Sequence, residues 1–320
     1  MTTIAVTGAS GFCGSHVAAT AAARGANVLC VGRRPGPVGR HIPWDASTAV
    51  PDLTGADVVV HCAAAVGDPV PGSPAEAAMH AVNVDGTARL LEAAAGRPVV
   101  WVSSASVYAP GPGRSRIAED HPVRGQLNAY GRTKAAGEAL ALAAGAVVLR
   151  PRAVYGAGDP HLVPRLLARV RAGLLLLPGR DVPLSLTAVE NLTDACLAAA
   201  RWAPGAYNIA DPVPYRRDAA IRTVLRAHGV RARIGHLPLP VAHSAATAAE
   251  ALSRLRPRVE PPLTRYAVDQ LAHSVVLDVS KAERQGWTAG RTLADYAVAT
   301  GPRAVAGGGR ERGGTGGSGR

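Results

Sequence analysis

Tyr130 and Lys134 are the residues of this 320-residue chain whose types and spacing point most directly to chemistry. They lie four positions apart in the alanine-rich, proline-free segment 128–144, so on a helix the phenol and the ammonium point to one side. A neighbouring cation lowers the pKa of a tyrosine, which lets the phenol act as acid and base near neutral pH. Lys134 is one of only two lysines in an arginine-rich chain, and a bidentate guanidinium would not serve the same purpose. We therefore predict an acid–base pair here.

Hydroxyl groups gather after a second apolar stretch. Ser103, Ser104 and Ser106 follow residues 99–102, which we predict to be a strand. Ligands of open α/β folds bind at the carboxyl ends of the strands. Serines at strand ends are commonly turn residues, but the position of these serines relative to a glycine loop near the N-terminus favours a place in the site.

That glycine loop contains Gly8, Gly11 and Gly14, between an apolar run at 4–6 and a helical segment at 16–24. Gly8 would make the tight turn, Gly11 would let the backbone approach a pyrophosphate, and Gly14 would let the helix pack closely on the strand. A purely structural turn explains the same spacing in a chain with 36 glycines. The strand–loop–helix context favours dinucleotide binding.

The end of the second predicted strand, 26–31, distinguishes the two nicotinamide cofactors. An acid there binds the ribose of NAD, whereas arginines accommodate the 2′-phosphate of NADP. The chain has Arg33 and Arg34 at this position, which favours NADP(H) over NAD(H), although two surface arginines in a bend would look the same. Asp45, after a short predicted strand at 40–44, is placed where an adenine ring could be contacted.

Further strands predicted at 57–61, 99–103 and 206–209 alternate with helices predicted at 76–95, 128–144 and 189–202. This alternation is typical of an α/β fold with a doubly wound parallel sheet of the Rossmann type. The small residues 62–65 after the strand at 57–61 would let a cofactor lie against the backbone. His61 is better explained as a packed histidine than as an acid or base.

Composition limits the function classes. The apolar content of 48% fits a globular protein, and no apolar run approaches the length of a membrane span; the densest, 174–177, is followed by Pro178. The four cysteines lack metal-ligand spacing, so we predict no metal site and a cytoplasmic location. The net charge of +12 comes from dispersed arginines, which argues against a nucleic-acid partner. The glycine-rich stretch 301–320 is expected to be a disordered tail.

Five motifs follow one another in chain order: Thr7-Gly-x-x-Gly-x-x-Gly14, Asp57-x-x-x-x-Cys-Ala-Ala64, Asn83-Val-x-Gly-Thr87, Ser103-Ser104 and Tyr130-x-x-x-Lys134. With these motifs the chain resembles the extended short-chain dehydrogenase/reductase superfamily, which includes the NAD(P)-dependent epimerases and dehydratases and the 3β-hydroxysteroid dehydrogenase type. The resemblance extends over residues 1 to about 299.

The resemblance implies hydride transfer between a nicotinamide cofactor and a small-molecule ketone or secondary alcohol. Tyr130 would be the general acid and base, Lys134 would hold the nicotinamide ribose, and Ser104 would bind the substrate oxygen. The cofactor would be bound by Thr7, Gly8, Gly11, Phe12 and Gly14 at the pyrophosphate, by Arg33 and Arg34 at the adenosine phosphate, and by Ala63 and Asn83 on its inner face.

The resemblance also implies a division of the chain. Residues 1–156 and 188–210 would form the dinucleotide-binding domain, and residues 157–187 and 211–300 a small substrate lobe. Within that lobe the segment 240–271, with Tyr266, would set the shape of the substrate site, although its apolar residues could equally be core. As in relatives, a homodimer would form through helices 76–95 and 128–144.

Departures from the family narrow the reaction. Ala105 and Ser106 stand where sugar-nucleotide dehydratases carry an acid pair, which argues against dehydration. Leu184 and Leu186 stand near the position where many epimerases carry a diphosphate-binding motif, which suggests a less charged substrate. We expect an NADP(H)-dependent oxidoreductase. An NAD-dependent sugar-nucleotide epimerase or ketoreductase and a non-catalytic dinucleotide-binding regulator stay open as alternatives.

Overall fold

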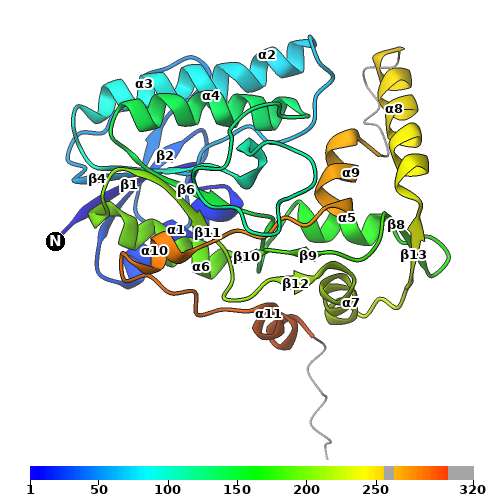
Figure 1. Ribbon diagram of the computed structural model, residues 1–320. Helices are drawn as coiled ribbons and strands as arrows, with labels where there is room; N and C mark the ends of the chain where they lie inside the picture. The colour runs from blue at the N-terminus through cyan, green and yellow to red at the C-terminus, as the bar shows by residue number, and fades with distance from the viewer. Residues whose placement is uncertain (256–262, 302–320) are drawn as a thin grey trace, which may run out of the picture.

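A seven-stranded parallel sheet forms the centre of the larger part of the molecule (Figure 1). The computed structural model describes residues 1–255 and 263–301. The strands are β1 (Thr3–Thr7), β2 (Asn27–Gly32), β3 (Arg40–Pro43), β4 (Val58–His61), β5 (Val99–Val102), β6 (Val147–Pro151) and β11 (Gly205–Ile209). Their order is β11-β6-β5-β4-β1-β2-β3, so the winding direction reverses at β1. This arrangement confirms the predicted Rossmann-type sheet and places the ligand crevice at the carboxyl end of β1.

Helices cover both faces of the sheet. On one face lie α1 (Phe12–Ala23), α6 (Val189–Ala198) and the short helix η3 (Ala199–Arg201); on the other lie α2 (Pro74–His80), η1 (Ala81–Asp85), α3 (Gly86–Ala94) and α4 (Ala129–Ala143). Successive residues of β1 point into separate cores, with Ala5 packed among residues of α3 and α4 and Val6 among residues of α1 and α6. Strands buried on both faces have to be apolar throughout.

The helix predicted at 76–95 is interrupted. Residues 81–85 form a π-helical turn between α2 and α3, and such turns in an α-helix often mark a functional position. Asn83 lies in this turn, with 1% of its surface exposed.

The remaining elements build a smaller lobe beside the sheet (Figure 1). They are β7 (Val154–Tyr155), α5 (Leu162–Ala168), β8 (Leu174–Pro178), β9 (Pro183–Leu184), β10 (Thr187–Ala188), β12 (Tyr215–Arg216), α7 (Arg217–Ala227), β13 (Arg233–Leu237), α8 (Leu239–Leu255), α9 (Arg265–Ala272) and α11 (Leu293–Thr300). The leucine run 174–177 is part of β8, which pairs in parallel with β13. Leu175 and Leu177 are buried and Leu174 and Leu176 exposed, the alternation expected of a strand with one covered face.

Near residue 280 the chain packs again on the part of the molecule that contains the seven-stranded sheet. Helix α10 (Ser280–Glu283) lies beside β11, and Ala282 and Trp287 pack in the core that contains Val6. The structure describes the chain as far as residue 301, so the predicted disordered tail lies outside the described residues from 302 onward. Within the described ranges, no helix is long and apolar enough to cross a membrane.

Candidate active site

The glycine loop is packed as the predicted roles require. Gly8 has a φ of +66°, and a Cβ at this position would lie 2.8 Å from the Ala63 nitrogen. A Cβ at Gly14 would lie 2.3 Å from the Gly8 oxygen, so the helix can sit this close only without a side chain there. Gly11 is the N-cap of α1, and among the described residues no side chain caps it. The first-turn N–H groups of α1 are thus oriented for an anion.

Thr7 and Asn83 were both predicted to contact the cofactor, and their side chains bind the main chain of the loop 62–65. Thr7 Oγ1 is 2.7 Å from His61 Nδ1 and accepts a hydrogen bond from the Ala63 N–H. Asn83 exchanges two hydrogen bonds with the main chain of Ala65. Both side chains are buried, so they fix the position of the loop 62–65 from the protein interior.

His61 is a packed residue, as the sequence suggested. Its ring lies between the rings of Trp44 and Trp101, and burial lowers its pKa to about 3. The imidazole is therefore neutral at physiological pH. Its hydrogen bond with Thr7 Oγ1 holds that side chain in place.

Tyr130 and Lys134 lie on α4, as predicted. Asn128 is the N-cap of this helix, and its side chain accepts a hydrogen bond from the Gly131 N–H. Lys134 Nζ donates to the Val102 oxygen at 2.7 Å and lies 3.6 Å from the centroid of the Trp101 ring. Burial lowers the pKa of Lys134 to about 7.

The pKa of Tyr130 moves in the direction opposite to the prediction. Burial raises it, and the nearby Tyr266 raises it further, whereas a hydrogen bond with Ser104 lowers it by less. The expected lowering by Lys134 does not contribute to this shift; the Lys134 Nζ donates to the Val102 oxygen and lies over the Trp101 ring. The Tyr130 phenol is therefore protonated at neutral pH, the state in which it can donate a proton.

The two neighbouring serines have different surroundings. Ser103 is buried and donates to Glu138, which forms a buried ion pair with Arg150. Ser104 is partly exposed and faces the same cavity as Tyr130. Ser103 also lines this cavity, but its hydroxyl is engaged by Glu138.

One cavity of about 430 Å³ brings most of the predicted site together. Its lining includes Gly8, Gly11, Phe12, Gly14, Ser104, Tyr130 and Lys134 from the prediction. From the larger part of the molecule, Cys13, Cys62 and Ser106 also line it; from the smaller lobe come Asp159, His161, Arg165 and Tyr266. Of these, the sequence analysis had placed Cys62 against the cofactor, Ser106 in the site and Tyr266 in the substrate lobe, and it had given no role to Cys13, Asp159, His161 and Arg165.

The residues predicted to bind the adenosine part of the cofactor are not among the described residues that line this cavity. Arg33 and Arg34 are exposed directly after β2, and Asp45 follows β3. Asp45 accepts hydrogen bonds from the Ser47 N–H and hydroxyl, which lower its pKa, with a smaller contribution from Arg33. Arg33 and Asp45 are thus close enough to interact at the carboxyl edge of the sheet.

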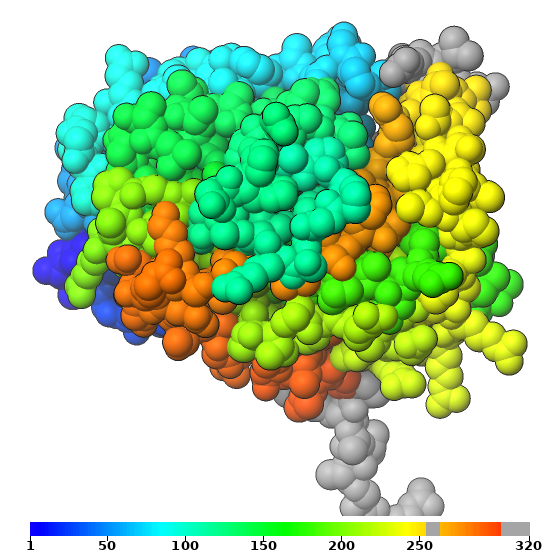
Figure 2. All heavy atoms as spheres, viewed as in Figure 1, coloured from blue at the N-terminus to red at the C-terminus, as the bar shows by residue number. Residues whose placement is uncertain are grey.

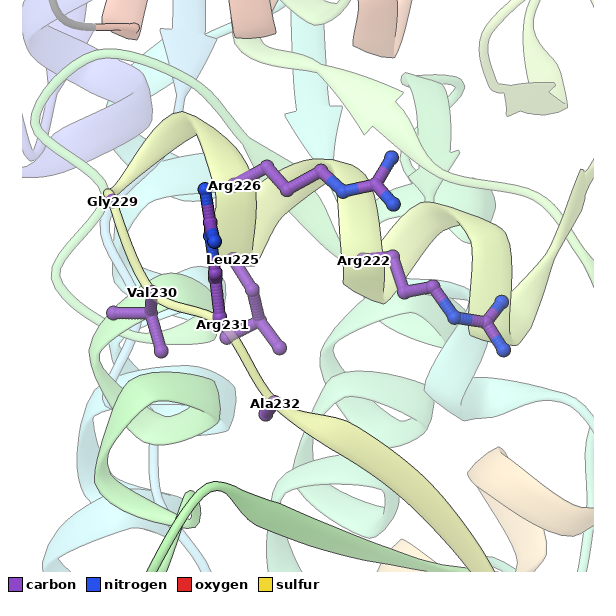
Figure 3. A pocket seen from close by; sticks show the side chains of 7 residues that line it. All are labelled: Arg222, Leu225, Arg226, Gly229, Val230, Arg231 and Ala232. Atoms are coloured by element: carbon purple, nitrogen blue, oxygen red, sulfur yellow. The ribbon is translucent and has the colours of Figure 1, made fainter.

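A larger hollow of about 630 Å³ lies elsewhere, beside α7 in the smaller lobe (Figure 3). The described residues of its lining are Arg222, Leu225, Arg226, Gly229, Val230, Arg231 and Ala232. The side chains of Arg222 and Arg226 extend from α7 to the same side (Figure 3). This set offers neither an acid–base pair nor a glycine loop. We therefore place the active site in the cavity of about 430 Å³, although the hollow beside α7 is larger.

The fold and the site define a class of protein, an α/β dinucleotide-binding oxidoreductase. Residues 4–210 match the model of the NAD dependent epimerase/dehydratase family. The chain therefore belongs to this family and is an NAD(P)-dependent oxidoreductase.

Two relatives are reductases by name. A ketoreductase of Stigmatella aurantiaca, named for a 4-hydroxy-2-methyl-3-oxo-4-farnesyl-3,4-dihydroquinoline-1-oxide, is 30% identical over 309 residues, covering 89% of this chain and 91% of the relative. A 2-alkyl-3-oxoalkanoate reductase of Shewanella oneidensis is 30% identical over 318 residues, covering 87% and 80%. Among solved structures, MoeE5 in complex with UDP-glucose and NAD has a TM-score of 0.71 at 26% identity, covering 94% of this chain and 97% of that one.

The residues present fit a dinucleotide. The glycine cradle leaves no room for a Cβ at Gly14, and the N-terminus of α1 opens into the cavity that holds Tyr130 and Lys134. When bound, the nicotinamide supplies the hydride.

Proposed function

We propose that this protein is an NADPH-dependent ketoreductase in which Tyr130 is the general acid. The observation that carries the proposal is that Tyr130, Ser104 and Lys134 share one cavity with the glycine loop. Ser104 and Tyr130 would bind the ketone oxygen, and Tyr130 would donate its phenolic proton to that oxygen. Lys134 would hold the ribose of the cofactor.

The protonated phenol fits the reductive direction. Reduction of a ketone needs a protonated acid, whereas oxidation of an alcohol needs a phenolate. Burial raises the pKa of Tyr130, so the phenol holds the proton that reduction consumes. The names of the two reductases described above support the same direction.

The preference for NADPH rests on Arg33 and Arg34, which lie at the end of β2 where an acid would favour NAD. MoeE5 and several other neighbours were solved with NAD, so the cofactor needs a direct test. We expect NADPH and NADP⁺ to raise the melting temperature more than NADH and NAD⁺ at equal concentration.

The activity test is the consumption of NADPH by the purified protein with a panel of ketones. Turnover of at least one ketone supports the proposal. If instead the protein retains NAD through purification and binds a diphosphate sugar, it is an epimerase. If it binds a dinucleotide and turns over neither class, the non-catalytic alternative holds.

We also propose the homodimer and the cytoplasmic location expected from the sequence. Helices α3 and α4 lie side by side on one face of the sheet, and Leu140 and Leu142 of α4 are about one-third exposed there. All four cysteines are free thiols, which fits a reducing compartment. Light scattering after gel filtration measures the oligomeric state.

A further inference from the structure

The Ser104 hydroxyl has two hydrogen-bonding neighbours in one residue, Ser106. Ser104 Oγ accepts from the Ser106 N–H at 3.1 Å and donates to Ser106 Oγ at 3.0 Å. The approach is this close because Ser104 is the N-cap of the short 3₁₀ helix η2 (Ala105–Val107). Both serines line the cavity. Ser106 therefore contacts, through its main chain and its side chain, the hydroxyl that we propose to bind the keto oxygen.

A phenol from the smaller lobe stands behind Ser106. Tyr266 Oη lies 2.6 Å from Ser106 Oγ, and either atom can be the donor of this hydrogen bond. Tyr266 also lines the cavity and lies in the first turn of α9. The hydrogen bonds thus run from the smaller lobe through Ser106 to Ser104.

Two buried arginines hold α9, and with it Tyr266, against the larger part of the molecule. Arg114 forms an ion pair with Asp269 at 2.7 Å, and Arg152 donates to the main-chain oxygen of Gln270 at 3.0 Å. Arg114 is 1% exposed and Arg152 6%. In Figure 2, α9 (orange) lies between α8 (yellow) and the larger part. The Tyr266 phenol is therefore positioned before any ligand arrives.

The count of hydrogens and acceptor positions decides where the Ser104 hydrogen can point. A serine hydroxyl carries one hydrogen and accepts at two positions. When Ser104 turns its hydrogen from Ser106 to a keto oxygen, Ser106 can donate to Ser104, and Tyr266 can donate to Ser106. The N–H and the hydroxyl of Ser106 then fill both acceptor positions of Ser104 Oγ. The Ser104 hydrogen is left directed at the substrate.

We infer that Ser106 is a positioning residue of the reduction that acts through Ser104, and that Tyr266 supports Ser106 from the smaller lobe. The inference rests on the proposed function, because it needs Ser104 to donate to the keto oxygen. Hydrogen bonds in a series polarise one another, so a Ser104 hydroxyl that accepts from Ser106 is a stronger donor. A stronger donor matters most when negative charge develops on the keto oxygen in the transition state. The contribution is therefore expected in kcat and not in KM.

The test is a double-mutant cycle with a ketone from the panel that the wild type reduces. kcat and KM are measured with saturating NADPH for the wild type, Ser104→Ala, Ser106→Ala and the double variant. Tyr266→Phe is measured beside them. The control is Tyr296→Phe, which removes a phenol of the same lobe that lies 2.9 Å from the exposed His228 Nε2. The melting temperature of each variant shows that it is folded.

We expect Ser104→Ala to lower kcat by about 100-fold, the effect of one donor to a developing oxyanion. Ser106→Ala should lower kcat by about 5- to 10-fold with KM within about twofold of the wild type, since the Ser106 N–H still contacts Ser104. Tyr266→Phe acts one hydrogen bond further away and should lower kcat by about twofold. Tyr296→Phe should keep the wild-type values.

The double variant gives the decisive comparison. A residue that acts through Ser104 has no effect once the Ser104 hydroxyl is gone, so the double variant should have the kcat of Ser104→Ala. Losses that multiply in the double variant would overturn the inference while the proposed function stands. A Ser106→Ala variant with the wild-type kcat would do the same.

Other outcomes bear on the proposed function itself. If Ser104→Ala keeps the wild-type kcat, then Ser104 does not bind the keto oxygen, and this inference fails with that assignment. A wild type that reduces no ketone of the panel, with either NADPH or NADH, contradicts the proposed function and this inference together.

Discussion

Two parts of the cavity lining are built differently. The wall that we propose for the cofactor, with Gly8, Gly11 and Gly14, comes from one short loop, whereas the wall that we propose for the substrate, with Ser106 and Tyr266, comes from segments far apart in the chain. Gly8, Gly11 and Gly14 act within a single loop. Ser106 and Tyr266 meet across 160 positions, and the Arg114–Asp269 pair that fixes α9 spans 155. The first wall depends on backbone geometry that a motif can encode, and the second on tertiary contacts between segments far apart in the sequence.

The strongest test of the substrate wall removes the buried ion pair. Asp269→Ala leaves Arg114, which is 1% exposed, without its carboxylate. Breaking a buried pair by removing one partner costs about 3–5 kcal/mol of unfolding free energy. We expect that loss in urea denaturation.

Arg116→Ala is the matched control, because it breaks a surface pair with Asp278 in which the arginine is 79% exposed. It should cost less than about 1 kcal/mol. Equal losses in the two variants would mean that the buried pair does not fix α9.

On the cofactor wall, Gly14→Ala puts a Cβ 2.3 Å from the Gly8 oxygen. The conflict is with backbone that cannot rotate away, so the loop has to shift, at a cost of about 1–3 kcal/mol of unfolding free energy. Because the shifted loop no longer fits the pyrophosphate, we expect dinucleotide affinity to fall by about 10- to 100-fold in calorimetric titration. Gly290→Ala, where nothing lies within 4 Å of the added Cβ, should bind as the wild type does. Unchanged affinity in Gly14→Ala would show that the loop does not hold the cofactor.

A smaller effect is expected at the adenosine end. The double variant Arg33→Ala/Arg34→Ala should weaken NADPH binding by about 10- to 100-fold, or about 1.4–2.8 kcal/mol, because two cations opposite the 2′-phosphate are lost. NADH affinity should change by less than about twofold, since NADH lacks that phosphate. Equal losses of affinity for NADPH and NADH would mean that Arg33 and Arg34 do not bind the 2′-phosphate and are surface charges without a cofactor role.

A change in the pH dependence of stability is also expected. The pKa of Lys134 is about 7 in the folded protein against a usual 10.5, so above about pH 7 the unfolded chain binds a proton that the folded chain does not. This residue therefore makes the unfolding free energy rise with pH. In Lys134→Met the rise between about pH 7 and pH 9 should be smaller, as measured by urea denaturation. The same slope in both proteins would mean that Lys134 stays protonated when folded.

The difference between the walls also explains what the sequence could predict. The glycine spacing, the apolar strands and the Tyr130–Lys134 pair are local patterns, and each predicted its element correctly. The strand pairing of β8 with β13 was not predicted, because residues 174–178 and 233–237 meet only in the folded lobe.

Burial explains why the structure differs from the sequence prediction at individual residues. Leu184 and Leu186, from which we expected a less charged substrate, are buried in the small-lobe core, so they carry no information about the substrate. The pKa of Tyr130 depends on its surroundings and on where the Lys134 ammonium points, and spacing along a helix specifies neither. Tyr266 was the one residue named in the 240–271 segment, but its hydroxyl partner could not be found without the fold.

The central claim, that Tyr130 is the acid of a ketone reductase, is tested most directly by NADPH consumption in the wild type and in Tyr130→Phe, with a ketone from the panel that the wild type reduces. The melting shift with NADPH is recorded in parallel. We predict that kcat falls by about 10²- to 10⁴-fold in the variant, while the NADPH-induced shift stays close to that of the wild type. Retained turnover in Tyr130→Phe would contradict the account, because the proton would then have to come from another group.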